Sequence, residues 1–156
     1  FVHGRTRAQG YSGDIDYNTL KTIKEESLIP VICSGNIFSP KDAKEMFEKT
    51  LCDGILVARG SLGNPWIFKN IESYLKTGEI APIPTILERK KALLKHLALI
   101  EKYKETSEFT KRGQMRRISQ FYIKGTRNAA KIREAFNRTK SYEEILEIIN
   151  SIEDGL

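Results

Sequence analysis

Two short apolar runs, each followed at once by a glycine-containing turn and a helix start, constrain the fold of this chain more than any other feature. The first run covers residues 28–33 and leads into the turn 34–36, and the second covers 54–58 and leads into a turn that begins at Arg59. Neither run alternates apolar and polar residues, which is typical of parallel strands covered on both faces. Two consecutive units of this kind predict parallel strands joined by helices.

The turn after the second run carries the residue types that bind phosphate in proteins. Gly60 and Gly63 allow backbone amides to approach a ligand closely, and Arg59 adds a guanidinium suited to two phosphate oxygens. Asn64 is predicted to cap the following helix with Pro65 at its first position, and a helix start favours anions. In eight-stranded α/β barrels the loops after the last two strands often hold a phosphate. The two turns together predict a phosphate-bearing ligand, and an ordinary strand-to-helix turn with a solvated arginine is the alternative.

The remaining patterns divide the chain at a proline-rich connector, residues 80–84. Before it, strands are predicted at 2–3, 28–33 and 54–58, and helices at 17–26, 40–49 and 65–76. After it the strand pattern disappears, and helices are predicted at 85–104, 111–125 and 127–138, followed by one that Ser141 caps. The chain is thus predicted to be an α/β part over residues 1–80 and a small four-helix bundle over residues 85–156.

Composition narrows the class of protein. With 156 residues and 40% hydrophobic content, the chain can bury one modest core or two small ones. No stretch approaches the roughly 18 apolar residues of a membrane span, and residues 1–4 show no secretory leader. Cys33 and Cys52 are too few for a disulfide framework and lack the spacing of metal ligands. We therefore expect a cytoplasmic protein with no metal and no membrane segment.

The net charge of +6 is concentrated in the second half of the chain. Residues 1–84 contain equal numbers of basic and acidic side chains, so residues 85–156 carry the whole excess. Within residues 111–140, ten side chains are basic and only Glu134 is acidic. Because ordinary solvated helix faces mix both signs, this stretch is a candidate site for a polyanion such as nucleic acid. A basic face that only keeps the protein soluble is the alternative.

Within this basic stretch, an apolar seam and a set of cations share one predicted helix. Met115, Ile118 and Tyr122 recur at helical spacing and are predicted to face the core, so Tyr122 is expected to pack rather than to stack on a base. His96, on the preceding helix, is expected to be a packed, hydrogen-bonded histidine. The cations of the stretch fall largely on other sides, where they can contact phosphates. The candidate RNA-binding residues are Arg112, Arg116, Arg117, Lys124 and Arg127.

The chain resembles the flavin-dependent tRNA-dihydrouridine synthases along essentially its whole length. The resemblance is carried by residues 2–13, which read VHGRTRAQGYSG, by 29–40, which read IPVICSGNIFSP, and by 58–68, which read ARGSLGNPWIF. Residues 115–125 are similar to the helical tRNA-binding domain of the family. Motifs of this length and order are far more specific than a single glycine-rich turn.

This resemblance implies the C-terminal part of an FMN-containing (β/α)8 TIM barrel, followed by a helical tRNA-binding domain. The family reduces the C5–C6 bond of uridines in tRNA, with hydride from the flavin, a proton from a cysteine, and NADPH as the reductant of the flavin. By position, His3 would lie beside the flavin and the uracil, and Arg5 near the pyrimidine, as the residues of the catalytic site. The residues implied to contact FMN are His3, Ser34, Gly35, Asn36, Ala58, Arg59 and Gly60.

Two positions depart from the pattern of the family. The usual Asn-Gly-Asp after the seventh strand reads Ser-Gly-Asn at 34–36, which removes a carboxylate, and the usual glycine before Arg59 is Ala58. The resemblance also places the catalytic cysteine and most of the barrel upstream of this chain, and neither Cys33 nor Cys52 matches that cysteine. We therefore expect the chain by itself to be inactive, to hold FMN weakly or not at all, and to bind tRNA weakly with a steep dependence on salt.

Two other interpretations stay open at the level of the sequence. The chain could be a non-catalytic RNA-binding protein whose barrel remnant is only a scaffold, or part of a different phosphate-binding TIM-barrel enzyme that acts on a sugar phosphate. The basic helices argue against the second interpretation, since a small substrate does not need so much concentrated positive charge.

Overall fold

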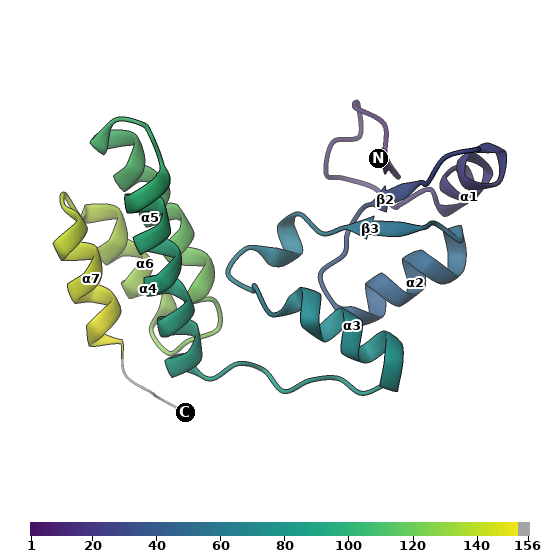
Figure 1. Ribbon diagram of the computed structural model, residues 1–156. Helices are drawn as coiled ribbons and strands as arrows, with labels where there is room; N and C mark the ends of the chain where they lie inside the picture. Colours follow the sequence, from purple (N-terminus) through teal and green to yellow (C-terminus); the bar gives the residue numbers. More distant parts are fainter. Residues whose placement is uncertain (153–156) are drawn as a thin grey trace. The chain divides into compact units, whose positions relative to one another are not determined.

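The chain forms three parallel strands followed mostly by helices, and it divides into two compact units (Figure 1). The structure is a computed structural model and describes residues 1–152. The first unit comprises Phe1–Ser61 and Trp66–Ala81, and the second comprises Leu62–Pro65 and the chain from Pro82 onward. The change of unit at Ala81 lies inside the segment for which the sequence predicts a connector.

The sheet of the first unit confirms the prediction of parallel strands. Its strands β1 (Val2–His3), β2 (Ile32–Ser34) and β3 (Gly54–Leu56) are arranged in the order β1-β2-β3. Both pairs are parallel, and Cys33 at the centre of β2 is in register with Val2 on one side and Ile55 on the other. The carboxyl ends of all three strands therefore lie at one edge of the sheet.

The two longer strands are shorter than predicted, and the structure shows why for β2. The strand predicted at 28–33 begins only at Ile32, because Pro30 has no N–H and the N–H of Val31 donates instead to Asp53 Oδ2 at 2.7 Å. Leu28, left outside the sheet, is fully exposed. The strand predicted at 54–58 ends at Leu56.

Three helices accompany the sheet: α1 (Tyr17–Glu26), α2 (Pro40–Thr50) and α3 (Ile67–Thr77). Ser39 caps α2 in a reciprocal capping box with Asp42, as its sequence position indicates. The prediction that Asn64 caps a helix starting at 65 is wrong, because α3 begins at Ile67 with Trp66 at the N-cap and no side-chain cap bond. The intervening chain instead contains a short 3₁₀ turn, η1 (Arg59–Ser61).

The core of the first unit lies between these helices and the sheet. α2 contacts β3 and both other helices, and its Ala43 and Met46 are fully buried. Leu20 from α1, Cys33 from β2 and Ile67 from α3 complete the same apolar cluster. This packing holds the strand ends, and therefore the turns that follow them, on a rigid base.

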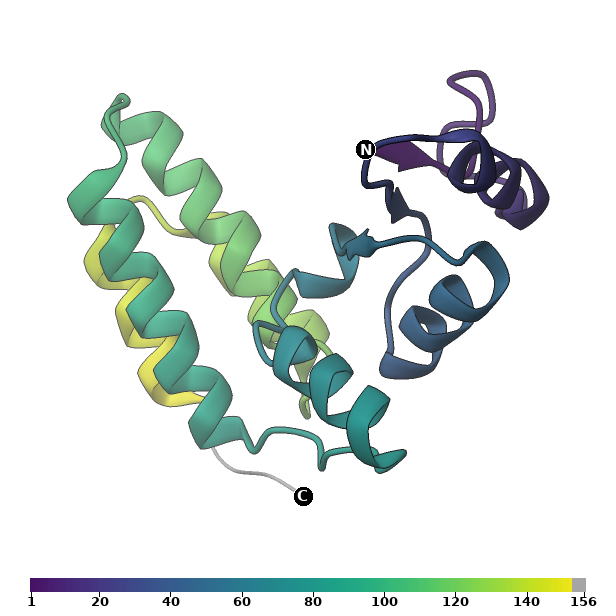
Figure 2. The same cartoon turned by 45° about the vertical axis from the view of Figure 1, so that its right-hand side comes forward.

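The second unit contains α4 (Ile86–Tyr103), α5 (Glu108–Tyr122), α6 (Ala129–Arg138) and α7 (Tyr142–Ser151). These four helices pack on one another, and α7 runs alongside α4 in both views (Figures 1 and 2). The predicted bounds of two helices shift. α5 covers Glu108–Tyr122 instead of 111–125, and its earlier start follows from the N-cap that Ser107 supplies. α6 begins at Ala129 instead of 127. No helix within residues 1–152 is long and apolar enough to cross a membrane.

The interior of the second unit confirms the packing roles predicted for two polar aromatic residues. Met115, Phe136 and Ile145 are fully buried in its core. Tyr122 is only 5% exposed, and its hydroxyl lies 3.3 Å from His96 Nδ1, with the two rings in an edge-on arrangement. Burial raises the pKa of the Tyr122 hydroxyl. Tyr122 therefore packs in the core, and His96 is its hydrogen-bonded neighbour.

Candidate functional site

A small hollow lies where β2 and β3 end. β2 ends at Ser34 and the chain turns there, while β3 ends at Leu56 and the chain passes into η1. The hollow has a volume of about 80 Å³. It is lined by His3, Tyr11, Ser34, Gly35, Asn36, Ile37, Phe38, Leu56, Ala58, Arg59 and Gly60. All seven residues for which the sequence predicts a cofactor contact are in this lining, and it includes no carboxylate.

The two turns approach each other so closely that one position requires glycine. A Cβ on Gly60 would lie 2.1 Å from the carbonyl oxygen of Ile37, an atom of the backbone that cannot rotate away. Asn36 has φ of 48°, a left-handed conformation that asparagine tolerates better than most residues. The backbone of both turns is therefore set by residue choice, and it brings the two strand ends to the same hollow.

Arg59 is held over the hollow by three groups from the first unit. Its Nη2 donates to Asn36 Oδ1 at 3.1 Å. Its guanidinium carbon lies 4.2 Å from the centre of the Tyr11 ring and 5.3 Å from that of Phe38, within the range of cation–π attraction. Because a guanidinium is always charged and presents several donors, this arrangement provides a fixed cation for an anionic ligand.

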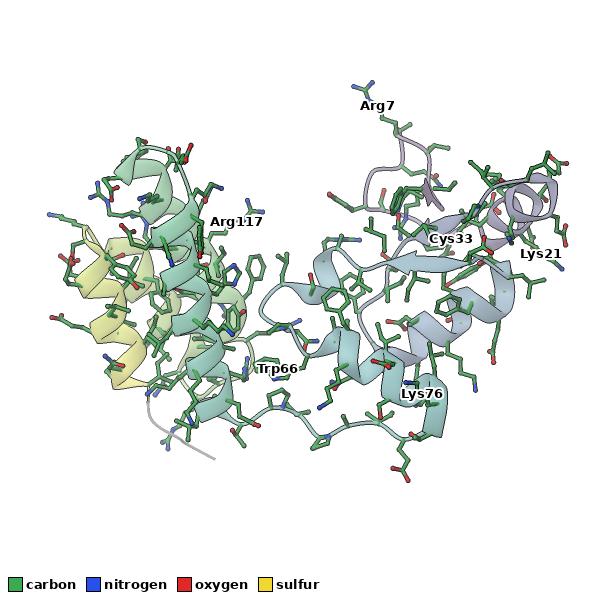
Figure 3. The ribbon with its side chains drawn as sticks, viewed as in Figure 1. Arg7, Lys21, Cys33, Trp66, Lys76 and Arg117 are labelled. Atoms are coloured by element: carbon green, nitrogen blue, oxygen red, sulfur yellow. The ribbon has the colours of Figure 1, made fainter. Side chains whose placement is uncertain are left out.

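Sequence reasoning missed Tyr11 and Phe38. Tyr11 lies in the loop between β1 and α1, and Phe38 precedes α2, so neither shares a periodic pattern with Arg59. Both side chains stay at least half exposed. Arg7, from the same loop as Tyr11, extends outward from its tip (Figure 3). No local signal marks these aromatic contacts, since they depend on how the loop returns over the strand ends.

Arg5 is turned inward, and the position near the pyrimidine that the resemblance implies for it stays a prediction. Its side chain is 9% exposed and does not line the hollow. Nε and Nη2 both donate to the carbonyl of Gly13, at 2.9 and 2.6 Å, and Nη1 donates to Asn36 Oδ1 at 3.2 Å. Arg5 therefore ties the β1–α1 loop to the turn after β2 from within the unit.

His3 lies on the rim of the hollow and is exposed to solvent. Its Nδ1 is 2.9 Å from Ser34 Oγ, and that hydroxyl donates to the carbonyl of Val2 at 3.4 Å. Since the hydroxyl has one proton, this chain of bonds favours the tautomer in which Nδ1 carries the imidazole proton. Nε2 is then the ring atom that can accept a hydrogen bond.

The two cysteines are not part of the hollow. Both are buried and neither forms a disulfide. Burial, and to a lesser extent the neighbouring Cys52, raises the pKa of the Cys33 thiol. A buried thiol with a raised pKa is a poor nucleophile and a poor proton donor to a ligand.

The structure shows that the candidate RNA-binding residues differ in how far their side chains are exposed to solvent. Arg117, Lys124 and Arg127 are exposed, and Arg117 extends outward from α5 (Figure 3). Arg112 is half-buried. Arg116 instead donates to the carbonyls of Asn137 and Thr139, both at 3.3 Å, and so satisfies the carboxyl end of α6.

One further arginine supports the basic region and was missed in the sequence. Arg89, on α4, donates from Nη2 to the carbonyl of Lys124 at 2.6 Å, and burial lowers its pKa. It thereby holds the turn after α5, where Gly125 has φ of 79°. Its position within an ordinary amphipathic helix carries no sign of this role.

The fold and the site together define a protein with a hollow at the ends of parallel strands, over which Arg59 is held, and with a basic helical unit. A family model described as "Dihydrouridine synthase (Dus)" matches residues 1–154, and the chain belongs to this family.

Similar proteins carry consistent names. The chain is 46% identical over 102 residues to "tRNA-dihydrouridine synthase B" of Pseudomonas putida, covering 65% of this chain and 30% of that protein. It is 41% identical over 137 residues to "Probable tRNA-dihydrouridine synthase" of Rickettsia bellii, covering 87% of this chain and 41% of that protein. It is 38% identical over 145 residues to "Probable tRNA-dihydrouridine synthase 1" of Synechocystis, covering 92% of this chain and 39% of that protein. The chain therefore spans well under half the length of these relatives.

Proposed function

We propose that this chain is the C-terminal portion of a tRNA-dihydrouridine synthase, comprising the last strands of a (β/α)8 barrel and a four-helix tRNA-binding domain. The observation that carries the proposal is the hollow itself. Two turns after adjacent parallel strands meet there, with Arg59 held over them by Asn36 and two aromatic rings. Phosphate-binding sites in barrels occupy this kind of place.

The residues present fit the phosphate end of FMN. The contact between Gly60 and Ile37 leaves no room for a Cβ at position 60, so the two backbones meet directly at this point. Arg59 supplies the cation, and no carboxylate lines the hollow to repel a phosphate. When bound, FMN supplies the hydride that reduces the C5–C6 bond of uridine, and NADPH is the proposed source of its electrons.

His3 and Arg5 are proposed to act differently beside the flavin and the uridine. His3 is on the rim, where Nε2 can accept a hydrogen bond from a bound group while Ser34 fixes the ring. Arg5 holds Asn36 and the β1–α1 loop, so it acts through the shape of the site rather than by reaching a ligand.

The helical unit is proposed to bind the tRNA backbone. Arg112, Arg117, Lys124 and Arg127 are the cations offered to phosphates, while Arg89 and Arg116 hold the turns beside them. Affinity from such contacts falls steeply as salt rises, because bound phosphates release their counterions. This tRNA substrate fits the cytoplasmic location expected from the sequence.

A chimeric enzyme tests the proposal. Residues 1–154 replace the matching part of the Rickettsia bellii relative, and dihydrouridine in tRNA is measured by mass spectrometry together with the visible absorbance of bound flavin. We expect the chimera to retain flavin and to form dihydrouridine. Arg59→Ala should remove most of the flavin, whereas Lys76→Ala, on the last turn of α3 (Figure 3), should not.

A chimera that folds and binds tRNA but contains no flavin would contradict the assignment of the hollow. Normal flavin with no tRNA affinity would contradict the role of the helical unit.

A further inference from the structure

We propose that Gly63 couples the hollow to the basic turn after α5, so that an anion at Arg59 and RNA at Lys124 each strengthen the binding of the other. Gly63 does not line the hollow and acts through the two turns beside it, so it is a positioning residue. The inference rests on the proposed function, in which the hollow binds a phosphate and the helical unit binds RNA.

The chain leaves the first unit directly after the hollow and returns to it four residues later. The segment Leu62–Pro65 packs with the second unit, whereas the chain on either side of it belongs to the first. Only two residues separate Gly60, which lines the hollow, from Gly63. The segment is therefore tied to the first unit by its covalent ends and to the second by its packing.

Within the second unit, Gly63 lies directly against the backbone of Phe121 near the end of α5. A Cβ at position 63 would lie 2.5 Å from both the carbonyl carbon and the carbonyl oxygen of Phe121, and 2.8 Å from its Cβ. Gly63 also has φ of 69°, a conformation that residues with side chains disfavour. Because none of the opposing atoms can move away by a rotamer change, the segment can dock on α5 in this way only with glycine at this position.

The peptide that Gly63 meets is the one that begins the basic turn after α5. The carbonyl of Phe121 accepts the backbone N–H of Ile123, and that of Lys124 at 3.4 Å. The carbonyl of Lys124 in turn accepts Nη2 of Arg89 at 2.6 Å, and the Lys124 side chain is exposed. A change in how Gly63 docks therefore acts on the turn that offers Lys124 to RNA.

The chain between the hollow and Gly63 is short and internally bonded. The N–H and Oγ of Ser61 both donate to the carbonyl of Ala58, at 3.1 and 2.8 Å, and so hold η1 in its turn. Gly60, inside η1, lies too close to the facing turn to accept a Cβ. A displacement at Gly63 is therefore passed to the turn at the hollow, because no slack chain lies between them.

The coupling works through two states of the segment Leu62–Pro65, one docked on α5 and one released. An anion at Arg59 holds η1 in place, RNA at Lys124 holds the turn after α5 in place, and docking needs both. A ligand shifts such an equilibrium only by its difference in affinity for the two states. Each ligand therefore raises the population of the state that the other binds, and the two enhancements of affinity must be equal.

Two variants interrupt the coupling by different means. Gly63→Ala blocks docking through the added Cβ. Gly78→Ala is its matched control, because Gly78 has φ of 75° and a Cβ there would meet nothing within 4 Å, so the backbone strain is similar and the clash is absent. The second variant inserts two glycines between Ser61 and Leu62, which leaves docking possible but lengthens the connection to the hollow. It keeps the inference testable if Gly63→Ala does not fold.

Both ligands are measured on the whole chain at constant ionic strength, maintained with chloride. Inorganic phosphate is followed through the backbone amide resonance of Gly60, and an unmodified tRNA transcript by filter binding with and without saturating phosphate. For the unchanged chain and for Gly78→Ala, we expect phosphate to raise the affinity for tRNA about fivefold, the low end of typical couplings between sites. In Gly63→Ala and in the insertion variant, we expect each ligand to bind separately and phosphate to leave the tRNA affinity unchanged.

The outcomes separate this inference from the proposed function. If both ligands bind the unchanged chain but phosphate does not change its affinity for tRNA, the role of Gly63 is overturned while both binding sites stand. Coupling that survives in the insertion variant, or that is lost in Gly78→Ala as well, also overturns it. If phosphate does not move the Gly60 resonance, or if tRNA does not bind, the proposed function fails and this inference fails with it.

Discussion

Gly60→Ala tests the close approach of the two turns that form the hollow. The added Cβ would lie 2.1 Å from the carbonyl oxygen of Ile37, whereas ordinary contact begins near 3.4 Å. One turn must therefore move by about 1.3 Å, the difference between these two distances. Overpacking of this kind costs about 1–3 kcal/mol. In a domain of 60–100 residues, each kcal/mol lowers Tm by roughly 4–8 °C.

The measurement uses a natural reporter of the first unit. The chain contains one tryptophan, Trp66, and it belongs to that unit (Figure 3). We expect the unfolding transition followed by its fluorescence to fall by between about 5 and 20 °C. Phosphate binding should weaken as well, because the moved turn carries Arg59.

A second glycine provides a control in which substitution by alanine should raise stability instead of lowering it. Gly113 lies inside α5, and a Cβ there would meet nothing within 4 Å. Gly113→Ala should therefore stabilise the second unit by about 1 kcal/mol through helix propensity and leave the Trp66 transition unchanged. If Gly60→Ala unfolds at the same temperature as the unchanged chain, the two turns do not approach each other this closely.

Three further predictions concern the charged residues. Arg117, Lys124 and Arg127 are exposed cations, and replacing all three by alanine should weaken tRNA binding. The slope of the logarithm of affinity against the logarithm of salt concentration should fall by about one for each phosphate that is no longer neutralised. A filter-binding series in rising salt that keeps its slope would contradict this prediction. Arg116→Met should lower the free energy of unfolding of the second unit by about 1–3 kcal/mol, because the carbonyls of Asn137 and Thr139 lose a charged donor. Chemical denaturation measures this change. Unchanged stability together with weaker tRNA binding would instead assign Arg116 to contact with the RNA. The hydrogen bonds from Lys24 and from the N–H of Val31 lower the pKa of Asp53 below its usual 3.8. The contribution of Asp53 to folding stability is therefore present above that pH and is lost as the pH falls through the lowered pKa. The difference in stability between the unchanged chain and Asp53→Asn should shrink on acidification, and a difference that grows would refute the linkage.

Local patterns in the sequence predicted most elements of this fold correctly. The runs before the two turns are strands in a parallel sheet, Ser39 and Ser141 begin helices, and Gly78 ends α3 in a left-handed conformation. These features depend on residues within a few positions of each other, so the sequence contains their physical cause. The bounds of α5 and α6, and the start of β2, were less accurate because caps and single hydrogen bonds compete at element ends.

The same reasoning found seven of the residues that line the hollow but not how they are held. Glycine turns and an arginine after strand-like runs marked Gly35, Arg59 and Gly60, and the resemblance added His3 and Asn36. It did not find Tyr11 or Phe38, and it did not show that the Arg5 side chain turns inward and holds the β1–α1 loop. For the second unit, the count of cations could not distinguish Arg116, which caps a helix, from the exposed Arg117.

The sequence by itself determined the parallel strands, the helices and the family, because each depends on periodicity, on local turns or on motifs that are continuous along the chain. Only the tertiary structure decided which groups meet at the hollow. The Asn36 oxygen receives donors from Arg5 and from Arg59, residues that precede and follow it at some distance in the chain. Tyr11 reaches Arg59 from a loop before the first helix. Such contacts depend on the register of three short strands and the path of one loop, and no pattern of neighbouring residues specifies them.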